Sequence, residues 1–220
     1  MLLFLLPYSK KQHPITFKNC AENRFNLEEF EPLSRLFEKG LSLNSTLAPL
    51  YRRFGNSFWE SLELWVMPPD VVKYIVDNSW VLSPIYGLIK ANACIPYGPI
   101  DWRELYQDKS LFDFWKNHIR NLSEKLLKGK WLVPFVSKRY LSLFDISSTE
   151  GIVKFEYYRK EAKVKNPQKH YAYTLRYIAE KNIDLFQIHR INFYDYKVHE
   201  VVHKEKEKLV ILKSEGKYEL

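Results

Sequence analysis

The chain has 220 residues, a hydrophobic fraction of 46%, a charged fraction of 27% and a formal net charge of +8. The 14 Phe, 15 Tyr and 6 Trp exclude a largely disordered chain and can fill the core of one large domain, or of two small ones. No apolar run approaches a membrane span, so we expect no membrane partner. The positive charge favours a polyanionic partner, and the alternative is a Lys-rich surface that only contacts water.

The first predicted element is a buried central strand over residues 2–6, where an apolar run ends at Pro7. The run is too short for a signal peptide and has no basic region before it. A polar loop is expected over residues 7–14. A helix is predicted over residues 26–40, with Asn26 as its N-cap.

The next part of the chain is less regular. A second helix is predicted over residues 46–54, whereas residues 59–66 are apolar without a clear period. Asp70 is expected to cap a helix over residues 71–78. Residues 91–99 include a Pro-Tyr-Gly-Pro sequence and are expected to form an ordered loop.

The second half of the chain has clearer patterns. Apolar side chains recur at steps of three and four over residues 110–127, which predicts an amphipathic helix with a basic outer face. The other predicted elements are strands over 131–136 and 152–158, a helix over 170–181, and strand-like runs over 186–198 and 201–212. This succession predicts one α+β (mixed α/β) domain over residues 1–220, with a mixed β-sheet flanked by helices. A weak subdivision near residue 150 is the alternative.

The cysteines and histidines give no sign of a metal centre. Cys20 and Cys94 each stand alone, so we expect neither a disulfide framework nor a Cys-ligated metal, and a reducing cytoplasmic location. His199 and His203 flank Glu200 at a spacing that would place both rings on one face of a helix. Because their neighbours alternate as in a strand, we expect no metal there and no cofactor. P-loop, dinucleotide-binding and nucleophile-elbow motifs are absent.

Basic residues are concentrated in two windows. Residues 116–139 contain seven Lys or Arg and one acid, and residues 154–176 contain seven and two. The rest of the chain is therefore acidic on balance. If both windows share a face, they would form a positive groove that binds phosphates with release of counterions. The alternative is that the lysines are solvated and the interleaved tyrosines belong to the core.

Several short motifs follow one another along the chain. They are Pro7 with Ser9-Lys10, the run Leu82–Ile89, the segment Ile95–Tyr97, the helix start Leu111–Trp115, the segment Val136–Tyr140, and later Arg176-Tyr177 and Ile191–Phe193. This order resembles the YaaA family of peroxide stress proteins. The chain is shorter than is usual for that family, and it carries Gly98 and Tyr171-Ala172 where the family has arginine-containing motifs.

The resemblance implies a cytoplasmic protein of the hydroperoxide response that binds DNA through a positively charged cleft, and a monomer is favoured. The residues expected to contact DNA are Lys10, Lys90, Lys138, Arg139, Tyr140, Lys163, Lys165, Lys169 and Arg176. The residues expected to line the cleft are Ser9, Ser83, Tyr86, Gly87 and Tyr97. Residues 95–102 are the nearest match to the helix–hairpin–helix element that the resemblance implies.

Two other functions stay open at this point. One is an enzyme that acts on a nucleotide or another small anionic metabolite with Ser, Tyr and Lys side chains of the same cleft. The other is a scaffold with neither activity, which exposed aromatic area would favour. Whether the protein catalyses any reaction is undecided, and a protein without catalytic activity is favoured.

Overall fold

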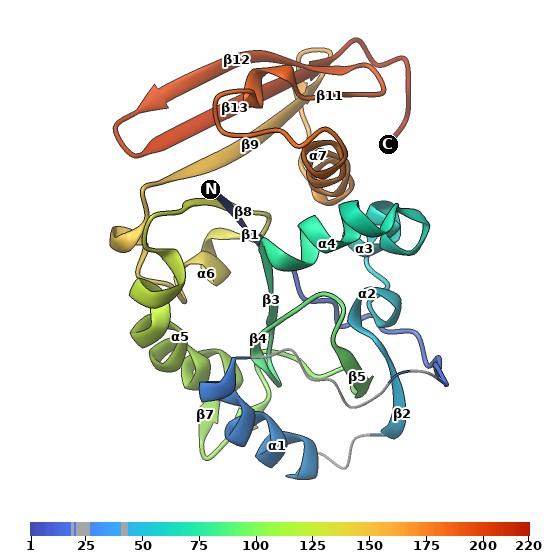
Figure 1. Cartoon of the computed structure of the whole chain (residues 1–220), viewed down its shortest axis with the longest axis vertical. Coiled ribbons are helices and arrows are strands. Elements are labelled where there is room, and N and C mark those ends of the chain that lie inside the picture. The colour runs from blue at the N-terminus through green and yellow to red at the C-terminus, as the bar shows by residue number, and fades with distance from the viewer. Residues whose placement is uncertain (19, 21–26, 41–43) are drawn as a thin grey trace.

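The computed structural model describes residues 1–18, 20, 27–40 and 44–220 and has a single α+β fold built on a nine-stranded sheet (Figure 1). The strands of this sheet are β1 (Leu2–Leu6), β3 (Ser79–Ser83), β4 (Gly87–Ile89), β8 (Trp131–Pro134), β9 (Gly151–Arg159), β10 (Ala162–Lys163), β11 (Asn192–Phe193), β12 (Tyr196–Lys204) and β13 (Glu207–Ser214). They are ordered β11-β12-β13-β9-β8-β1-β3-β4, and β10 pairs with β9. The expected mixed sheet flanked by helices is therefore confirmed.

The middle of the sheet is parallel. Strand β1 runs parallel to both β3 and β8, β8 runs parallel to β9, and β9 runs parallel to β13. Antiparallel strands flank this core, with β4 next to β3 and β12 next to β13. All five residues of β1 are buried, as predicted for a central strand with both faces covered.

Helices cover the central strands from two sides. They are α1 (Glu31–Gly40), α2 (Leu50–Arg53), α3 (Ser57–Leu62), α4 (Pro69–Asp77), α5 (Leu111–Leu127), α6 (Lys138–Leu141) and α7 (Gln168–Glu180). Short 3-10 helices are η1 (Glu28–Phe30), η2 (Leu64–Val66), η3 (Ile146–Ser148) and η4 (Ile188–Arg190). Figure 1 shows α5 and α6 on one side of β1 and β3, with α3 and α4 on the other.

Most elements of the second half agree with the sequence prediction. Helix α5 starts after Ser110, whose hydroxyl accepts a hydrogen bond from the Asp113 amide and so caps the helix. Strands β8 and β9 and helix α7 lie at the predicted places, although α7 begins two residues early. The prediction for 186–198 is wrong in its first part, since residues 188–190 form η4 and the strands begin at Asn192.

Two predictions in the first half are wrong for the same reason. The first four residues of the helix expected over 46–54 belong instead to β2 (Asn44–Pro49), and part of the expected loop 91–99 forms β5 (Cys94–Tyr97). These two strands pair with each other, which gives their backbone hydrogen bonds partners that no local pattern reveals. Helix α2 begins only after Pro49. A third small ribbon joins β6 (Leu105–Tyr106) to β7 (Lys109–Ser110).

The helix starts also differ from the prediction. Helix α1 begins at Glu31, after η1, and the expected cap Asn26 lies outside the described residues. The N-cap of α4 is Pro68, with no side-chain hydrogen bond, while Asp70 sits inside the first turn. A carboxylate in the first turn still interacts favourably with the helix dipole.

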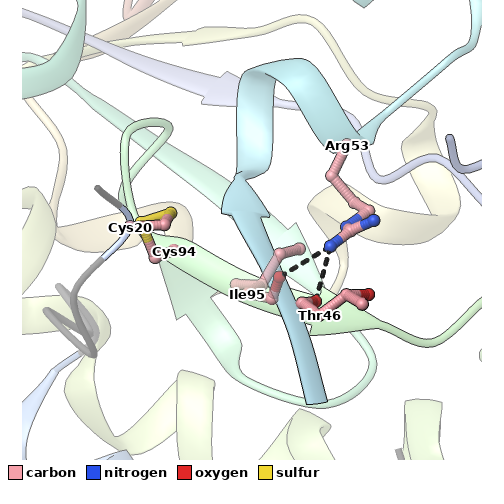
Figure 2. Close-up of a disulfide and its surroundings, with 5 residues drawn as sticks. All are labelled: Cys20, Thr46, Arg53, Cys94 and Ile95. Carbon is pink, nitrogen blue, oxygen red and sulfur yellow. Dashed lines mark hydrogen bonds between the residues drawn. A yellow bond between two sulfur atoms is a disulfide. The ribbon is translucent and has the colours of Figure 1, made fainter. Parts of the chain in front are cut away.

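The cysteine prediction is wrong, because Cys20 and Cys94 form a disulfide (Figure 2). Their Cα atoms are 5.8 Å apart although 74 positions separate them in the sequence. Local spacing cannot reveal such a long-range pair. Close by, the fully buried Arg53 side chain donates hydrogen bonds to the carbonyls of Thr46 and Ile95 at 2.7 and 3.3 Å (Figure 2).

Candidate anion-binding site at the carboxyl ends of the parallel strands

The topology of the sheet defines a place where ligands commonly bind. The chain leaves β1 toward β3 on one side, and it leaves β8 toward β9 on the other side. Adjacent parallel strands whose connections diverge in this way leave a crevice at their carboxyl ends. The segment after β1 contains Ser9 and Lys10, and the segment after β8 contains Lys138, Arg139 and Tyr140. Residues that the sequence analysis singled out therefore meet at this switch point.

Asp101 links the first of these segments to the loop that follows β5. Its carboxylate pairs with Lys10 Nζ at 3.3 Å and with Arg103 Nε at 3.0 Å. The hydrogen bonds from the Arg103 side chain and backbone, followed by the one from Lys10, hold the pKa of Asp101 far below its usual value. Asp101 thus stays ionised and keeps both cations at the carboxyl end of β1.

Aromatic rings pack next to these charged side chains. The Trp102 ring lies 5.5 Å from Tyr140 and 6.5 Å from Tyr8, measured between centroids. Phe112 lies 6.1 Å from Tyr140 and carries the Arg139 guanidinium 4.8 Å above its ring. Burial raises the pKa values of Tyr8 and Tyr140, so both phenols remain neutral hydrogen-bonding groups near pH 7.

A hollow of about 430 Å³ extends the site toward β9 and the start of α7. Its lining includes Ser137, which precedes Lys138, and the two lysines Lys163 and Lys165. Lys163 also pairs with Glu156 at 2.5 Å across the β9–β10 ribbon. This hollow brings part of the second basic window next to the end of the first.

The predicted cations differ in how fully they are neutralised. Among the described side chains, no carboxylate forms an ion pair with Lys138, Arg139, Lys165 or Lys169. Arg176, by contrast, pairs with Glu180 at 2.7 Å and with Glu63 at 3.3 Å, which leaves it little capacity for another anion. The unpaired four are the cations best placed to attract a phosphate.

Comparison with known proteins identifies the family. The family model described as peroxide stress protein YaaA matches residues 10–202. The chain belongs to the YaaA family. It is also similar to UPF0246 protein FN1762 of Fusobacterium nucleatum, with 28% identity over 133 residues. That match covers 54% of this chain and 52% of the relative, so the chain spans about half the length of the curated relative it matches.

Lys90 lies away from the other expected contacts of this YaaA-family protein. It follows β4, which runs antiparallel to β3, and therefore sits at the amino end of the parallel strands. Its Nζ donates to the carbonyls of Asp77 and Ser79 at 3.1 and 2.9 Å. Burial lowers its pKa to about 8. Lys90 is thus placed to hold the chain around β3 and not to join the switch-point cations.

The residues expected to line a cleft are mostly inside the fold. The buried Ser9 hydroxyl donates to the Lys11 carbonyl at 2.6 Å, and the Ser83 hydroxyl accepts from two amides of its own turn. The buried Tyr86 hydroxyl donates to Glu38 at 2.5 Å. In this YaaA-family chain these three side chains stabilise the ends of β1 and β3.

Gly87 and Tyr97 are also structural in their surroundings. Gly87 has φ of +65°, and a Cβ atom there would come within 2.6 Å of the Trp115 ring. A glycine is therefore required to turn the chain into β4. The half-buried Tyr97 ring, on β5, lies 5.7 Å from the Arg53 guanidinium.

Sequence reasoning missed Asp101 and Arg103. Their signal is an Asp-x-Arg sequence that begins two residues after Pro99 and overlaps the end of the segment 95–102, the nearest match to the helix–hairpin–helix element. That segment consists of β5 and a loop, so the described structure has no helix pair there.

Metal ligands and membrane-spanning helices are the last features to consider in this YaaA-family protein. Within the described ranges, no three His, Cys, Asp or Glu side chains are grouped to hold a metal ion. His199 and His203 both lie on strand β12, so the helical spacing that would let them share a metal is not realised. Nor does any helix in the described part of the chain have the length and apolar character needed to cross a membrane.

Proposed function

We propose that this protein serves the response to peroxide by binding DNA at the carboxyl ends of its parallel strands. Family membership supports the role in peroxide stress. The observation that supports DNA is the hollow beside β8 and β9, which Lys165 lines and whose lining residues Ser137 and Gln168 directly precede Lys138 and Lys169. These three cations have no acidic partner among the described residues.

The physical basis is the release of counterions. Each phosphate that a lysine or arginine neutralises frees condensed cations, so affinity falls linearly with salt on logarithmic axes, by about 0.9 per contact on duplex DNA. Tyr140 adds an aromatic face that is half-buried beside Arg139. Such a ring can stack on an unpaired base, so DNA with unpaired bases should bind at least as well as a continuous duplex.

The test is a fluorescence anisotropy titration with single-stranded, duplex and bubble DNA at several salt concentrations. The test variant is Lys138→Gln/Lys165→Gln, which removes one charge after β8 and one from the lining of the hollow. The matched control is Lys73→Gln/Lys128→Gln. It removes the same charge from side chains that are 75% and 77% exposed, on α4 and at the end of α5.

We expect the test variant to bind more weakly and its salt slope to flatten by about two, one for each lost phosphate contact. The control should keep both the affinity and the slope within error, apart from a small general effect of charge. Binding that does not depend on salt, or an equal loss in the two variants, would refute the proposed surface. The enzyme alternative gains no support from Ser9 and Ser83, whose hydroxyls are buried and hydrogen-bonded.

A further inference from the structure

The two cysteines join segments that run side by side through the site. One segment follows β1 and includes Lys10 and Gln12. The other is β5 with the loop after it, and it ends near Asp101. Three tethers connect them in order: the Cys20–Cys94 disulfide, the hydrogen bonds of Gln12 with Gly98, and the Lys10–Asp101 ion pair. The disulfide thus closes one end of a ladder whose other end is the cationic site.

We propose that Cys20 and Cys94 are a hydroperoxide-sensitive thiol pair that fastens these two segments when it is oxidised. The proposal is independent of DNA binding, since it concerns the chemistry of the sulfur atoms and the order of the chain around Cys20. It assigns the pair a substrate class, hydroperoxides, which suits a family of peroxide stress proteins.

The surroundings favour reversible chemistry. Both cysteines are half-buried, so a small hydroperoxide or a reducing thiol can reach them, whereas a fully buried disulfide would be inert. Other contacts hold the segments together without the sulfur bond. The Phe17 amide donates to the Leu47 carbonyl at 2.9 Å, and Leu47 belongs to β2, which pairs with β5. The thiols should therefore remain neighbours after reduction and be able to pair again.

Arg53 also connects the two segments. Its guanidinium donates to the carbonyl of His13 at 2.7 Å on the first segment and to that of Ile95 at 3.3 Å on the second. Figure 2 shows Arg53 beside Ile95, the residue after Cys94 in β5. This contact keeps β5 and the loop after it in place in either redox state, so the effect of reduction should concentrate around Phe17 and Cys20.

The reaction balances without a metal. One thiolate attacks the distal oxygen of the hydroperoxide, which breaks the O–O bond, releases the alcohol or water, and leaves a sulfenic acid. The second thiolate attacks that sulfur, forms the S–S bond and expels hydroxide, which is protonated to water. Two thiols and one hydroperoxide thus give one disulfide, one alcohol (water from hydrogen peroxide) and one water. A thiol reductant reverses the change by thiol–disulfide exchange.

The first experiment follows the sulfur atoms in the wild-type 220-residue chain. The protein is reduced with dithiothreitol, separated from the reductant and exposed to increasing concentrations of hydrogen peroxide. Free thiols are then blocked with N-ethylmaleimide, and the mass of the intact protein is measured by mass spectrometry. We expect the mass to fall by two hydrogens and both maleimide adducts to disappear as peroxide increases. Two adducts after peroxide treatment, or a disulfide that dithiothreitol cannot open in the folded protein, would overturn the proposal. Cys20→Ser and Cys94→Ser should each abolish the loss of two hydrogens.

The second experiment tests the fastening by hydrogen exchange in the oxidised and reduced wild-type protein, so it does not depend on whether a variant folds. We expect the amides of Phe17 and Cys20 to exchange roughly tenfold faster after reduction, because their hydrogen bonds lie next to the broken sulfur bond, whereas the amides of Gly98 and Ile100 should change little. Helix α5 serves as the internal control and should not change. Equal exchange of the Phe17 and Cys20 amides in the two states would overturn the fastening role.

Discussion

Reducing the Cys20–Cys94 disulfide should lower the melting temperature of the protein by a predictable amount. The bond joins residues 74 positions apart, so it removes much of the freedom of a long loop in the unfolded chain. In the chain-entropy description, a closed loop of that length contributes roughly 4.5 kcal/mol at 25 °C. For a domain of this size, each kcal/mol shifts the melting temperature by about 2–4 °C, which gives a fall of about 9–18 °C.

The assay is a thermal unfolding scan with and without dithiothreitol. The Cys20→Ser/Cys94→Ser variant serves as the control, since it should melt near the reduced wild type and show no response to the reductant. A wild-type shift below about 2 °C would refute the reasoning, because it would mean that the unfolded chain gains little freedom when the bond opens. A reductant effect on the double variant would show that the shift has another cause.

Three more substitutions test contacts that the structure gives. Gly87→Ala should lower the unfolding free energy by about 2–4 kcal/mol in urea, because φ is positive and the new methyl group meets the Trp115 ring; a loss below about 1 kcal/mol would contradict the crowding. Arg53→Met should cost about 2–4 kcal/mol, since three backbone carbonyls lose a donor, and a stabilised variant would show that burying the charge costs more. Burial lowers the pKa of His170 to about 4, so on acidification the unfolded chain takes up a proton before the folded one does. The unfolding free energy should therefore fall between about pH 6.5 and pH 4, by up to roughly 3 kcal/mol. Urea titrations at each pH should show that His170→Phe removes this part of the pH dependence. A His170→Phe variant with the same pH slope as the wild type would contradict this assignment.

The elements that the sequence predicts well are those whose signal is local. In β1 all consecutive side chains are buried, and in α5 one face of the helix is buried, so each element has an apolar pattern that a short stretch of sequence reveals. Strands β2 and β5 lack such a pattern, because each depends on pairing with the other across the fold. The disulfide escaped prediction for the same reason, since two single cysteines carry no spacing that marks them as partners.

The residues of the candidate site were likewise predicted only in part. Lys10, Lys138 and Arg139 were predicted and lie together, because parallel strands bring the residues after them to one edge of the sheet. Ser83 and Tyr86 were expected in the same place, but the Ser83 hydroxyl bonds its own buried turn and the Tyr86 hydroxyl bonds Glu38 of α1. Sequence alone does not distinguish such buried contacts from an open cleft. Asp101 was missed because its partners come from the segment after β1 and from its own loop.

The central position of β1 means that the nascent chain contains this strand before it contains the strands that pair with it. Its partners are residues 79–81 of β3 and residues 131–134 of β8, so the ribosome makes the first strand long before either neighbour. At about 5–20 residues per second, β1 waits roughly 6–26 s for β8 to be synthesised. Until β8 has been made, a fully apolar strand lacks at least one of its two neighbours, which leaves hydrophobic surface open on the growing chain.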